Sequence, residues 1–481
     1  MKLFPHFLFF LVVSVTSAAA FSANIGVNYG TLGNNLPKPT KSVELIKTLK
    51  PKQVKLYSPV DPQILKALNG TNIQVSIMVP NEILSDISVN QTMANEWVRN
   101  NLVAYYPHTL IRYLLVGNEL LSRTDDANKK VWHDLVPAMR KIQFALKSFG
   151  LLEVKVGTPM LMVGMPMLMD VLESSSFPPS NGTFRSDIAV PVIKPLLQFL
   201  NKTKSFFFVD CYPYFAWSKS YKTVSLDYAL FKGGVEYTDP VSGLTYTNML
   251  DQLLDTLHFA MKKLGFPHIR IWIAETGWPN GGDIDQIGAN VYNAATYNRN
   301  LVKKLNAKPA VGTPAMPGVV LPTWIFSLYN ENQKVGQGTE RHWGLLYPNG
   351  SRIYPIDLTG QTLESDYPPL PAPDNNEPYK GKIWCVLAKG ANMTLLSDAI
   401  TYACGQGDGT CAAIQPGGKC YKPNLLTLHA SYAFSAYWAQ FRSQGATCFF
   451  HGLAVQTSKN PSHGSCNFPS VTLSEGLYLA S

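Results

Sequence analysis

Residues 269–279 read Ile-Arg-Ile-Trp-Ile-Ala-Glu-Thr-Gly-Trp-Pro, an almost uninterrupted apolar run that leads into a glutamate. Parallel strands covered on both faces have such near-continuous apolar sequences, whereas half-exposed strands alternate apolar and polar residues. The glycine and proline that follow are typical of a loop. The stretch therefore predicts a buried parallel strand over 269–274, with Glu275 at its carboxyl end.

Seven more short apolar runs occur in the first 330 or so residues, and helix-compatible segments separate most of them. They are Ile25–Tyr29, Val54–Tyr57, Ile73–Val79, Ile111–Val116, Val154–Thr158, Phe206–Tyr212 and Pro322–Leu328. Eight strands with helical crossovers predict an α/β fold, a (β/α)8 TIM barrel. An open doubly wound sheet is the alternative, but it usually carries a glycine-rich phosphate loop after the first strand. The sequence Tyr-Gly-Thr-Leu-Gly at 29–33 does not match one.

Composition limits the class of protein. The 481 residues are 46% apolar and only 15% charged, which argues against a disordered chain, a coiled coil or a basic nucleic-acid arm. The net charge is 41 − 32 = +9. This excess is compatible with attraction to an acidic polymer and equally with simple solubility. We expect no nucleic-acid partner.

The chain divides into segments of different character. Lys2, the apolar run Phe7–Val15 and Ala18-Ala19-Ala20 form a secretory signal peptide. No later segment reaches the roughly 18 apolar residues of a membrane span, so we expect an exported monomer in the cell wall or vacuole. The predicted divisions are a signal peptide over 1–20, a catalytic domain over 21–360, a Pro-rich spacer over 361–382, a small, mainly helical module over 383–470 and a tail over 471–481.

Cysteines and glycosylation sequons also indicate export. Six of the seven cysteines fall in the last hundred residues, which predicts three disulfides, although spacing alone allows 15 pairings. They are Cys385, Cys404, Cys411, Cys420, Cys448 and Cys466. No cysteine or histidine spacing typical of a metal site accompanies them, so we expect no metal. The six Asn-x-Ser/Thr sequons are at Asn69, Asn90, Asn181, Asn201, Asn349 and Asn392.

Two glutamates follow predicted strands directly. Glu119 comes after Ile111–Val116 through Gly-Asn, and Glu275 ends the run described above. A single glutamate in such a place is more often a salt-bridge partner at the barrel rim. The fourth and seventh strands, however, face each other across a barrel mouth, where catalytic groups lie. Hydrolysis of a glycosidic bond needs two carboxyl groups that flank the bond.

Longer motifs carry a family resemblance. They include Ile-Gly-Val-Asn-Tyr-Gly at 25–30, Val-Gly-Asn-Glu at 116–119, Tyr-Pro-Tyr-Phe-Ala at 212–216, Ala-Glu-Thr-Gly-Trp-Pro at 274–279, Asn-Glu-Asn-Gln-Lys at 330–334 and Glu-Arg-His-Trp-Gly-Leu at 340–345. With these motifs the chain resembles the plant glycoside hydrolases of family 17, the endo-1,3-β-glucanases. The last hundred residues resemble an X8-type (family 43) carbohydrate-binding module.

The resemblance implies roles for individual residues. Glu119 would be the general acid/base and Glu275 the nucleophile of a retaining reaction on 1,3-β-glucan, with carboxyl groups about 5–5.5 Å apart and no cofactor. Tyr212 would orient Glu275, and Lys334 would favour its ionised form. The implied substrate-binding residues are Tyr29, Asn118, Tyr212, Glu331, Lys334 and Glu340. The implied disulfides are Cys385–Cys448, Cys404–Cys411 and Cys420–Cys466.

One position departs from the family pattern. Asp210 stands where the family usually has an asparagine, and Cys211 beside it is predicted to be a buried free thiol. A second carboxylate beneath the nucleophile would raise the pKa of Glu275 if both were ionised. This leaves two alternatives to an endo-1,3-β-glucanase, namely a non-catalytic wall-glucan binder and a transglycosylase on the same barrel. Specificity for mixed 1,3-1,4 linkages is also open.

Overall fold

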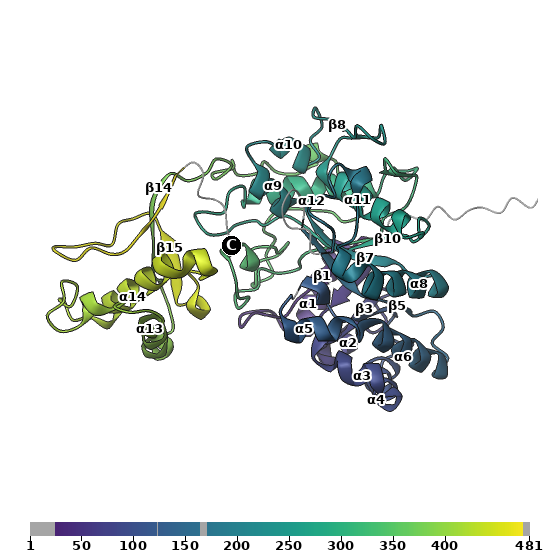
Figure 1. The fold of residues 1–481 in the computed structure, drawn as a ribbon, viewed down its shortest axis with the longest axis horizontal. Helices are drawn as coiled ribbons and strands as arrows, with labels where there is room; N and C mark the ends of the chain where they lie inside the picture. Colours follow the sequence, from purple (N-terminus) through teal and green to yellow (C-terminus); the bar gives the residue numbers. More distant parts are fainter. Residues whose placement is uncertain (1–24, 123, 164–170, 475–481) are drawn as a thin grey trace, which may run out of the picture.

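The larger part of the chain is a closed parallel barrel (Figure 1). The computed structural model describes residues 25–122, 124–163 and 171–474, so the predicted signal peptide and the end of the tail lie outside the described residues. The strands of the main sheet run in the order β5-β4-β3-β2-β1-β13-β10-β7-β6. Their bounds are β1 (Ile25–Tyr29), β2 (Gln53–Leu56), β3 (Gln74–Val79), β4 (Ile111–Val116), β5 (Lys155–Gly157), β6 (Pro159–Val163), β7 (Phe207–Tyr212), β10 (Ile271–Thr276) and β13 (Thr323–Ile325).

The barrel closes through a single broken strand. β5 pairs with β4 and β6 pairs with β7, and only Thr158 separates β5 from β6. The two pieces therefore act as the fifth of eight barrel strands. The predicted (β/α)8 barrel is confirmed, but the fifth strand extends beyond the predicted end at Thr158, and the side chains of Met160 and Met162 are buried.

Helices cover the outer face of the sheet, and the longer ones bury an apolar stripe at helical spacing. In α1, for example, Val43, Ile46 and Leu49 are buried, while Glu44, Lys47 and Thr48 between them are exposed. The helices of the barrel are α1 (Pro39–Leu49), α2 (Pro62–Ala67), α3 (Leu84–Val89), α4 (Gln91–Val98), α5 (Asp126–Trp132), α6 (Leu135–Ser148), α7 (Ser186–Ile188), α8 (Lys194–Thr203), α9 (Pro213–Ser220), α10 (Leu226–Ala229), α11 (Met249–Lys263) and α12 (Val291–Leu305). Two short hairpins, β8 (Tyr237–Thr238) with β9 (Thr245–Tyr246) and β11 (Gly312–Thr313) with β12 (Met316–Pro317), project from it.

Aromatic side chains fill the inside of the barrel. Phe208, Trp272 and Trp324 come from three neighbouring strands, with the ring centroids of Trp272 and Trp324 4.8 Å apart and those of Phe208 and Trp324 6.0 Å apart. Met78 and Leu115 complete this buried cluster. A barrel interior is a packed core and not a pore. Polar side chains at the carboxyl ends of the strands therefore lie above a tightly packed apolar core.

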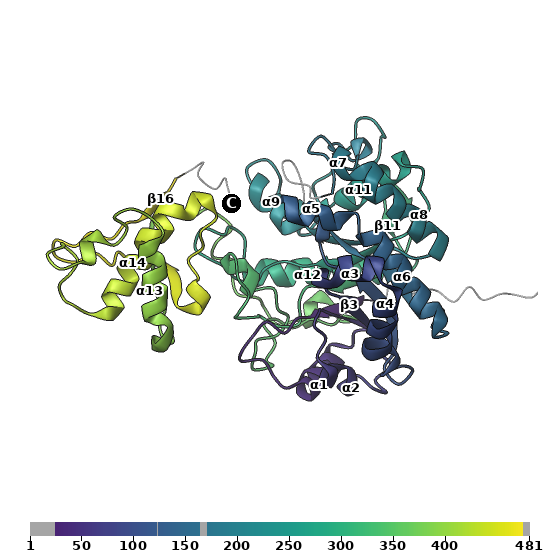
Figure 2. The same ribbon diagram turned by 60° about the horizontal axis from the view of Figure 1, so that its bottom comes forward.

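The C-terminal module has its own core beside the barrel (Figure 2). Helices α13 (Leu396–Gly405) and α14 (Leu426–Phe441) pack with a three-stranded antiparallel sheet of β14 (Gly381–Leu387), β15 (Ala454–Thr457) and β16 (Val471–Leu473). This sheet is not part of the sequence prediction. The disulfides join Cys385 to Cys448, Cys404 to Cys411 and Cys420 to Cys466, as the family resemblance implies. Cys211 is a buried free thiol in the barrel, as predicted.

Candidate active site

A β-bulge turns Glu275 into the barrel mouth. Trp272 and Ala274 face the barrel interior, while Ile271 and Ile273 face the surrounding helices. Regular alternation would therefore point Glu275 outwards. The register of β10 shifts between Ile273 and Glu275 against β7, and between Ile273 and Thr276 against β13. Bulges beside active sites re-aim side chains in this way, so Glu275 can face inwards directly after Ala274.

A strained turn after β4 positions Glu119. Its backbone has a φ of 49°, a left-handed conformation that costs a non-glycine residue on the order of 1 kcal/mol. Asn81 holds the turn, because its Oδ1 accepts the N–H of Asn118 (2.8 Å) and its Nδ2 donates to the carbonyl of Asn118 (3.0 Å). Gly117 makes this approach possible, since a Cβ there would lie 2.8 Å from Oδ1 of Asn81.

The two predicted catalytic glutamates meet. One carboxylate oxygen from each of Glu119, Asp210 and Glu275 lies within 4.8 Å of the other two. The side chain of Glu275 is 6% exposed, so it lies deep in the mouth without being sealed from it. Glu119 is half-buried. The cluster also contains its own cation, Lys55 of β2, whose Nζ lies 2.7 Å from Glu275 and 3.8 Å from Asp210. Lys55 thus supplies one positive charge inside the acidic cluster.

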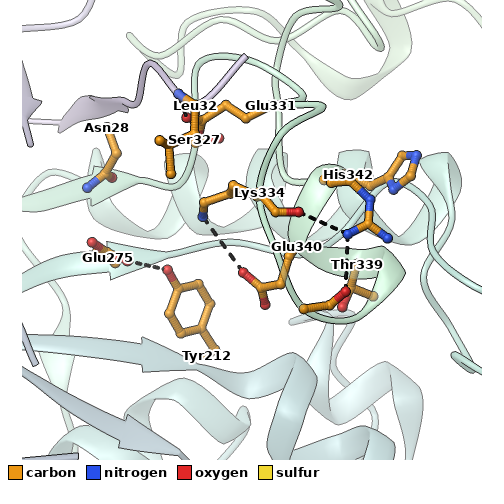
Figure 3. Close-up of polar contacts among 12 residues, drawn as sticks. Asn28, Leu32, Tyr212, Glu275, Ser327, Glu331, Lys334, Thr339, Glu340 and His342 are labelled. Carbon is orange, nitrogen blue, oxygen red and sulfur yellow. Dashed lines mark hydrogen bonds and ion pairs between the residues drawn. The ribbon is translucent and has the colours of Figure 1, made fainter. Parts of the chain in front are cut away.

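Three donors surround the carboxylate of Glu275. Lys55 Nζ and the hydroxyl of Tyr57 donate to Oε1, and the hydroxyl of Tyr212 donates to Oε2 at 2.5 Å. Figure 3 shows the Tyr212 hydroxyl pointing directly at Glu275. Asn28 of β1 donates in turn to the Tyr57 hydroxyl at 2.9 Å and to the carbonyl of Ala274 at 3.0 Å. Both the orientation and the charge of Glu275 are therefore fixed by its neighbours.

The pKa values of Glu275 and Asp210 are shifted in opposite directions. Burial disfavours the ionised form of Glu275, but the ammonium of Lys55 and the hydrogen bonds from Lys55, Tyr212 and Tyr57 lower its pKa below the ordinary value. For Asp210, which is fully buried, burial raises the pKa well above the usual range. Lys55 opposes this shift, whereas Glu275 and Glu119 add to it. The structure thus differs from the sequence expectation, because the raised pKa belongs to Asp210 and not to Glu275.

The loop after β13 carries a charged cluster that lies beside Tyr212 (Figure 3). Lys334 Nζ lies 3.7 Å from Glu340 and 4.2 Å from the centroid of the Phe326 ring. In Figure 3 the Lys334 and Glu340 side chains point into the space beside Tyr212 and Glu275. Glu331 is only 3% exposed and accepts the N–H of Leu32 at 2.7 Å, so it fastens the loop after β1.

Two sequence-based assignments change. Tyr29, expected to contact substrate, lies on the outer face of β1, 3% exposed, with its ring against Tyr329, which donates to Ser42 of α1. The neighbouring Asn28 points inwards instead, because side chains alternate along a strand. The lowering of the Glu275 pKa expected from Lys334 comes chiefly from Lys55. The sequence does contain an indication that Lys55 is a site residue, because a lysine inside a buried strand requires a partner of opposite charge.

Replacing this lysine tests its electrostatic role. In Lys55→Met, Glu275 loses its counter-charge, so the pKa of its carboxyl is expected to rise. The ionised form of Glu275 is present above its pKa and disappears as pH falls through it. The acid limb of the kcat/KM profile should therefore move to higher pH, and removing one partner of a buried pair should lower stability by about 3–5 kcal/mol. Lys55→Arg, which keeps the charge, is the control. An unmoved acid limb in Lys55→Met would contradict this role.

Comparison with known proteins agrees with this geometry. The profile of the glycosyl hydrolases of family 17 matches residues 25–358, and that of the X8 domain matches residues 383–455. The chain is 53% identical to the probable glucan endo-1,3-beta-glucosidase A6 of Arabidopsis thaliana over 98% of this chain and 100% of the relative. It is 37% identical to the glucan endo-1,3-beta-D-glucosidase of Olea europaea over 96% and 97%.

A solved structure shares the barrel. The beta-1,3-glucanase and allergen CJP38 of Cryptomeria japonica pollen superposes with a TM-score of 0.64 at 37% identity, covering 70% of this chain and 99% of that one. The chain therefore belongs to the glycosyl hydrolases of family 17, and an X8 domain follows its catalytic barrel.

Proposed function

We propose that this protein hydrolyses internal 1,3-β-glucosidic bonds of 1,3-β-glucan with retention of anomeric configuration. The observation that carries the proposal is the pair Glu119 and Glu275, whose carboxyl oxygens approach within 4.8 Å while Lys55 keeps Glu275 ionised. An approach within 4.8 Å suits a retaining enzyme, since an inverting enzyme needs about 6.5–9.5 Å to admit water between the acids. The names of the relatives supply the linkage and the endo mode of cleavage.

The reaction would proceed in two displacements. In the first, Glu119 donates a proton to the leaving glycosidic oxygen while Glu275 attacks the anomeric carbon and forms a glucosyl ester. In the second, Glu119 accepts a proton from water, and the water oxygen displaces Glu275 from the anomeric carbon. The protein regains its starting protonation state, and one water is consumed for each bond broken.

Asn118 is placed to bind the sugar beside this bond. Its buried Oδ1 accepts no hydrogen bond from the described residues, while Asn81 holds its backbone on both sides. A buried acceptor without a partner is costly, and a sugar hydroxyl would satisfy it. We assign this position to the 2-hydroxyl of the reacting glucose, because contacts to that group strengthen in the transition state.

Asp210 does not argue for a non-catalytic binder. Burial raises the pKa of Asp210 well above its usual range and so favours the neutral form, which resembles the asparagine of the family in shape and charge. Asp210→Asn should therefore keep kcat/KM within about threefold of the parent. A carboxyl whose pKa is higher in the folded than in the unfolded protein makes the fold less stable as pH rises. Asp210→Asn removes this group, so the variant should melt at a higher temperature than the parent at pH 8. A hundredfold loss of activity would show that the Asp210 charge is required.

The function is tested by the products from a defined linear 1,3-β-glucan. Endo-hydrolysis should release a ladder of oligosaccharides whose new reducing ends appear first as the β-anomer in proton NMR spectra. Initial α-anomers would contradict the assigned roles of the two glutamates. Products longer than the substrate would indicate the transglycosylase alternative. Binding without any cleavage would indicate the glucan-binding alternative.

We further propose that the protein is exported and acts outside the cell as a monomer. All six sequon asparagines, Asn69, Asn90, Asn181, Asn201, Asn349 and Asn392, are exposed and thus accessible to glycosylation. The three disulfides suit an oxidising compartment. Within the described ranges, none of the helices has the length and apolar character needed to cross a membrane.

A further inference from the structure

The C-terminal module is fastened to the loop that follows the nucleophile strand. Residues 280–290 form the larger part of the connection from β10 to α12 and are called the 280–290 loop below. Arg442 of the module forms an ion pair with Asp285 at 2.5 Å, and only 12% of the Asp285 side chain is exposed. Gln456 donates to Asp285 at 3.2 Å and accepts the N–H of Ile284 at 3.0 Å. The Ile284 side chain packs against the core of the module. The contact thus combines a charge pair, two hydrogen bonds and an apolar residue.

The chain that leads to the module is held by the same loop. The carbonyl of Asn375 accepts the N–H of Gly288 at 2.8 Å, and Asn375 Nδ2 donates to the carbonyls of Gln286 (3.1 Å) and Ala289 (3.0 Å). Asn290 donates to Asn375 Oδ1 at 2.7 Å. Asn375 lies in the segment 361–382, which the sequence predicts to be a spacer. Four hydrogen bonds thus fix Asn375 to the 280–290 loop. We call this fixed segment around Asn375 the strap; only a few residues separate it from β14 of the module.

The 280–290 loop also supports the charged wall of the cleft. Gln286 accepts the N–H of Thr339 at 2.8 Å, and Asp283 accepts the N–H of Gly338 at 2.8 Å. Arg341 continues the connection, because its guanidinium lies 3.8 Å from the ring centroid of Phe449 in the module. The same guanidinium donates to the carbonyl of Lys334 at 3.0 Å. The module therefore touches the 331–341 loop, which carries Lys334 and Glu340, both directly and through the 280–290 loop.

We propose that the module is a docked part of the catalytic cleft and holds the 331–341 loop in the conformation that presents Lys334 and Glu340. It is not a freely tethered binder. The three sets of contacts come from different parts of the chain, namely the body of the module, the strap and the cleft loop. Each set restricts the position of the module relative to the barrel. The activity readout below rests on the proposed glucanase function, whereas the structural readouts do not.

Charge exchange across the contact tests the docking in the full-length chain. Asp285→Arg and Arg442→Asp each place like charges together, so each should increase the radius of gyration in small-angle X-ray scattering and speed hydrogen exchange in residues 331–341. Each should also raise KM by about 3–30-fold on a 1,3-β-gluco-oligosaccharide too short to reach the module, with a smaller change in kcat. The double variant, Asp285→Arg with Arg442→Asp, restores the pair and should restore all three measurements.

Lys419→Asp is the matched control, since Lys419 is an exposed lysine of the module outside this contact. Its scattering, exchange and KM should equal those of the parent. Single variants that behave like Lys419→Asp would overturn the proposal, as would a double variant no better than the singles although its circular dichroism shows a native fold. Scattering and exchange require no turnover, so a failure of the proposed function leaves the docking result readable.

Discussion

Replacing Glu275 with glutamine is expected to lower kcat on 1,3-β-glucan by roughly ten-thousandfold or more. The amide has nearly the shape of the carboxylate but cannot form the glucosyl ester, and it carries no charge to stabilise the developing oxocarbenium ion. The change also removes the anion that Lys55 and two tyrosines are arranged to hold. Release of reducing ends from a linear 1,3-β-glucan, with product identity checked by chromatography, measures the loss.

The matched control is Glu44→Gln on α1, where the side chain is 65% exposed and forms an ion pair with Lys41. It should retain full activity, because an exposed pair of this kind contributes little. Deamidation would regenerate the parent residue, so mass spectrometry must verify the Glu275→Gln protein. If verified protein keeps more than about one-hundredth of the parent activity, Glu275 is not the nucleophile.

Removing the carboxyl of Glu119 should have a large effect that depends on the leaving group. For Glu119→Ala, we expect kcat on the polysaccharide to fall by about 100–10,000-fold, because a sugar alkoxide leaves poorly without a proton. With a dinitrophenyl glycoside, whose leaving group needs no proton, the first displacement should remain close to the parent rate. A burst of dinitrophenolate followed by slow turnover would report this, since hydrolysis of the ester still lacks its base.

Azide provides the second arm of this experiment. It is a nucleophile that needs no general base, and the alanine leaves room for it beside the anomeric carbon. Azide should accelerate turnover of Glu119→Ala and yield a β-glucosyl azide, while the parent enzyme should show no such acceleration. An α-glucosyl azide, or equal losses on both substrates without rescue, would contradict the assignment of Glu119 as acid/base in a retaining reaction.

The sequence allowed much of the barrel and half of the site to be predicted. The strands were visible because buried parallel strands have continuous apolar runs, and Glu119 and Glu275 could be found because each directly follows such a run. The contacts of Glu275 with Lys55 and Tyr212 could not be derived in this way. Lys55 and Glu275 are 220 positions apart, and nothing in the local sequence pairs one buried charge with another.

Side-chain direction was the other quantity that the local pattern did not determine. Asn28 and Tyr29 are adjacent, and only the closed barrel shows that the asparagine faces the site and the tyrosine faces α1. The bulge before Glu275 is similar, because one shifted residue in the register reverses the direction that alternation would predict. The segment around Asn375 is predicted to be a spacer, because proline-rich composition indicates an extended chain but does not show what that chain contacts.

The amino-acid sequence by itself thus determined which segments become strands, where the two acids stand along the chain and which segment carries the disulfides. These properties depend on local apolar patterning and on residue type. Tertiary structure alone decided that the pKa of Glu275 is lowered and that of Asp210 is raised. The physical reason is that a pKa depends on burial and on charges only a few ångströms away, and strands distant in sequence supply both once the barrel has closed.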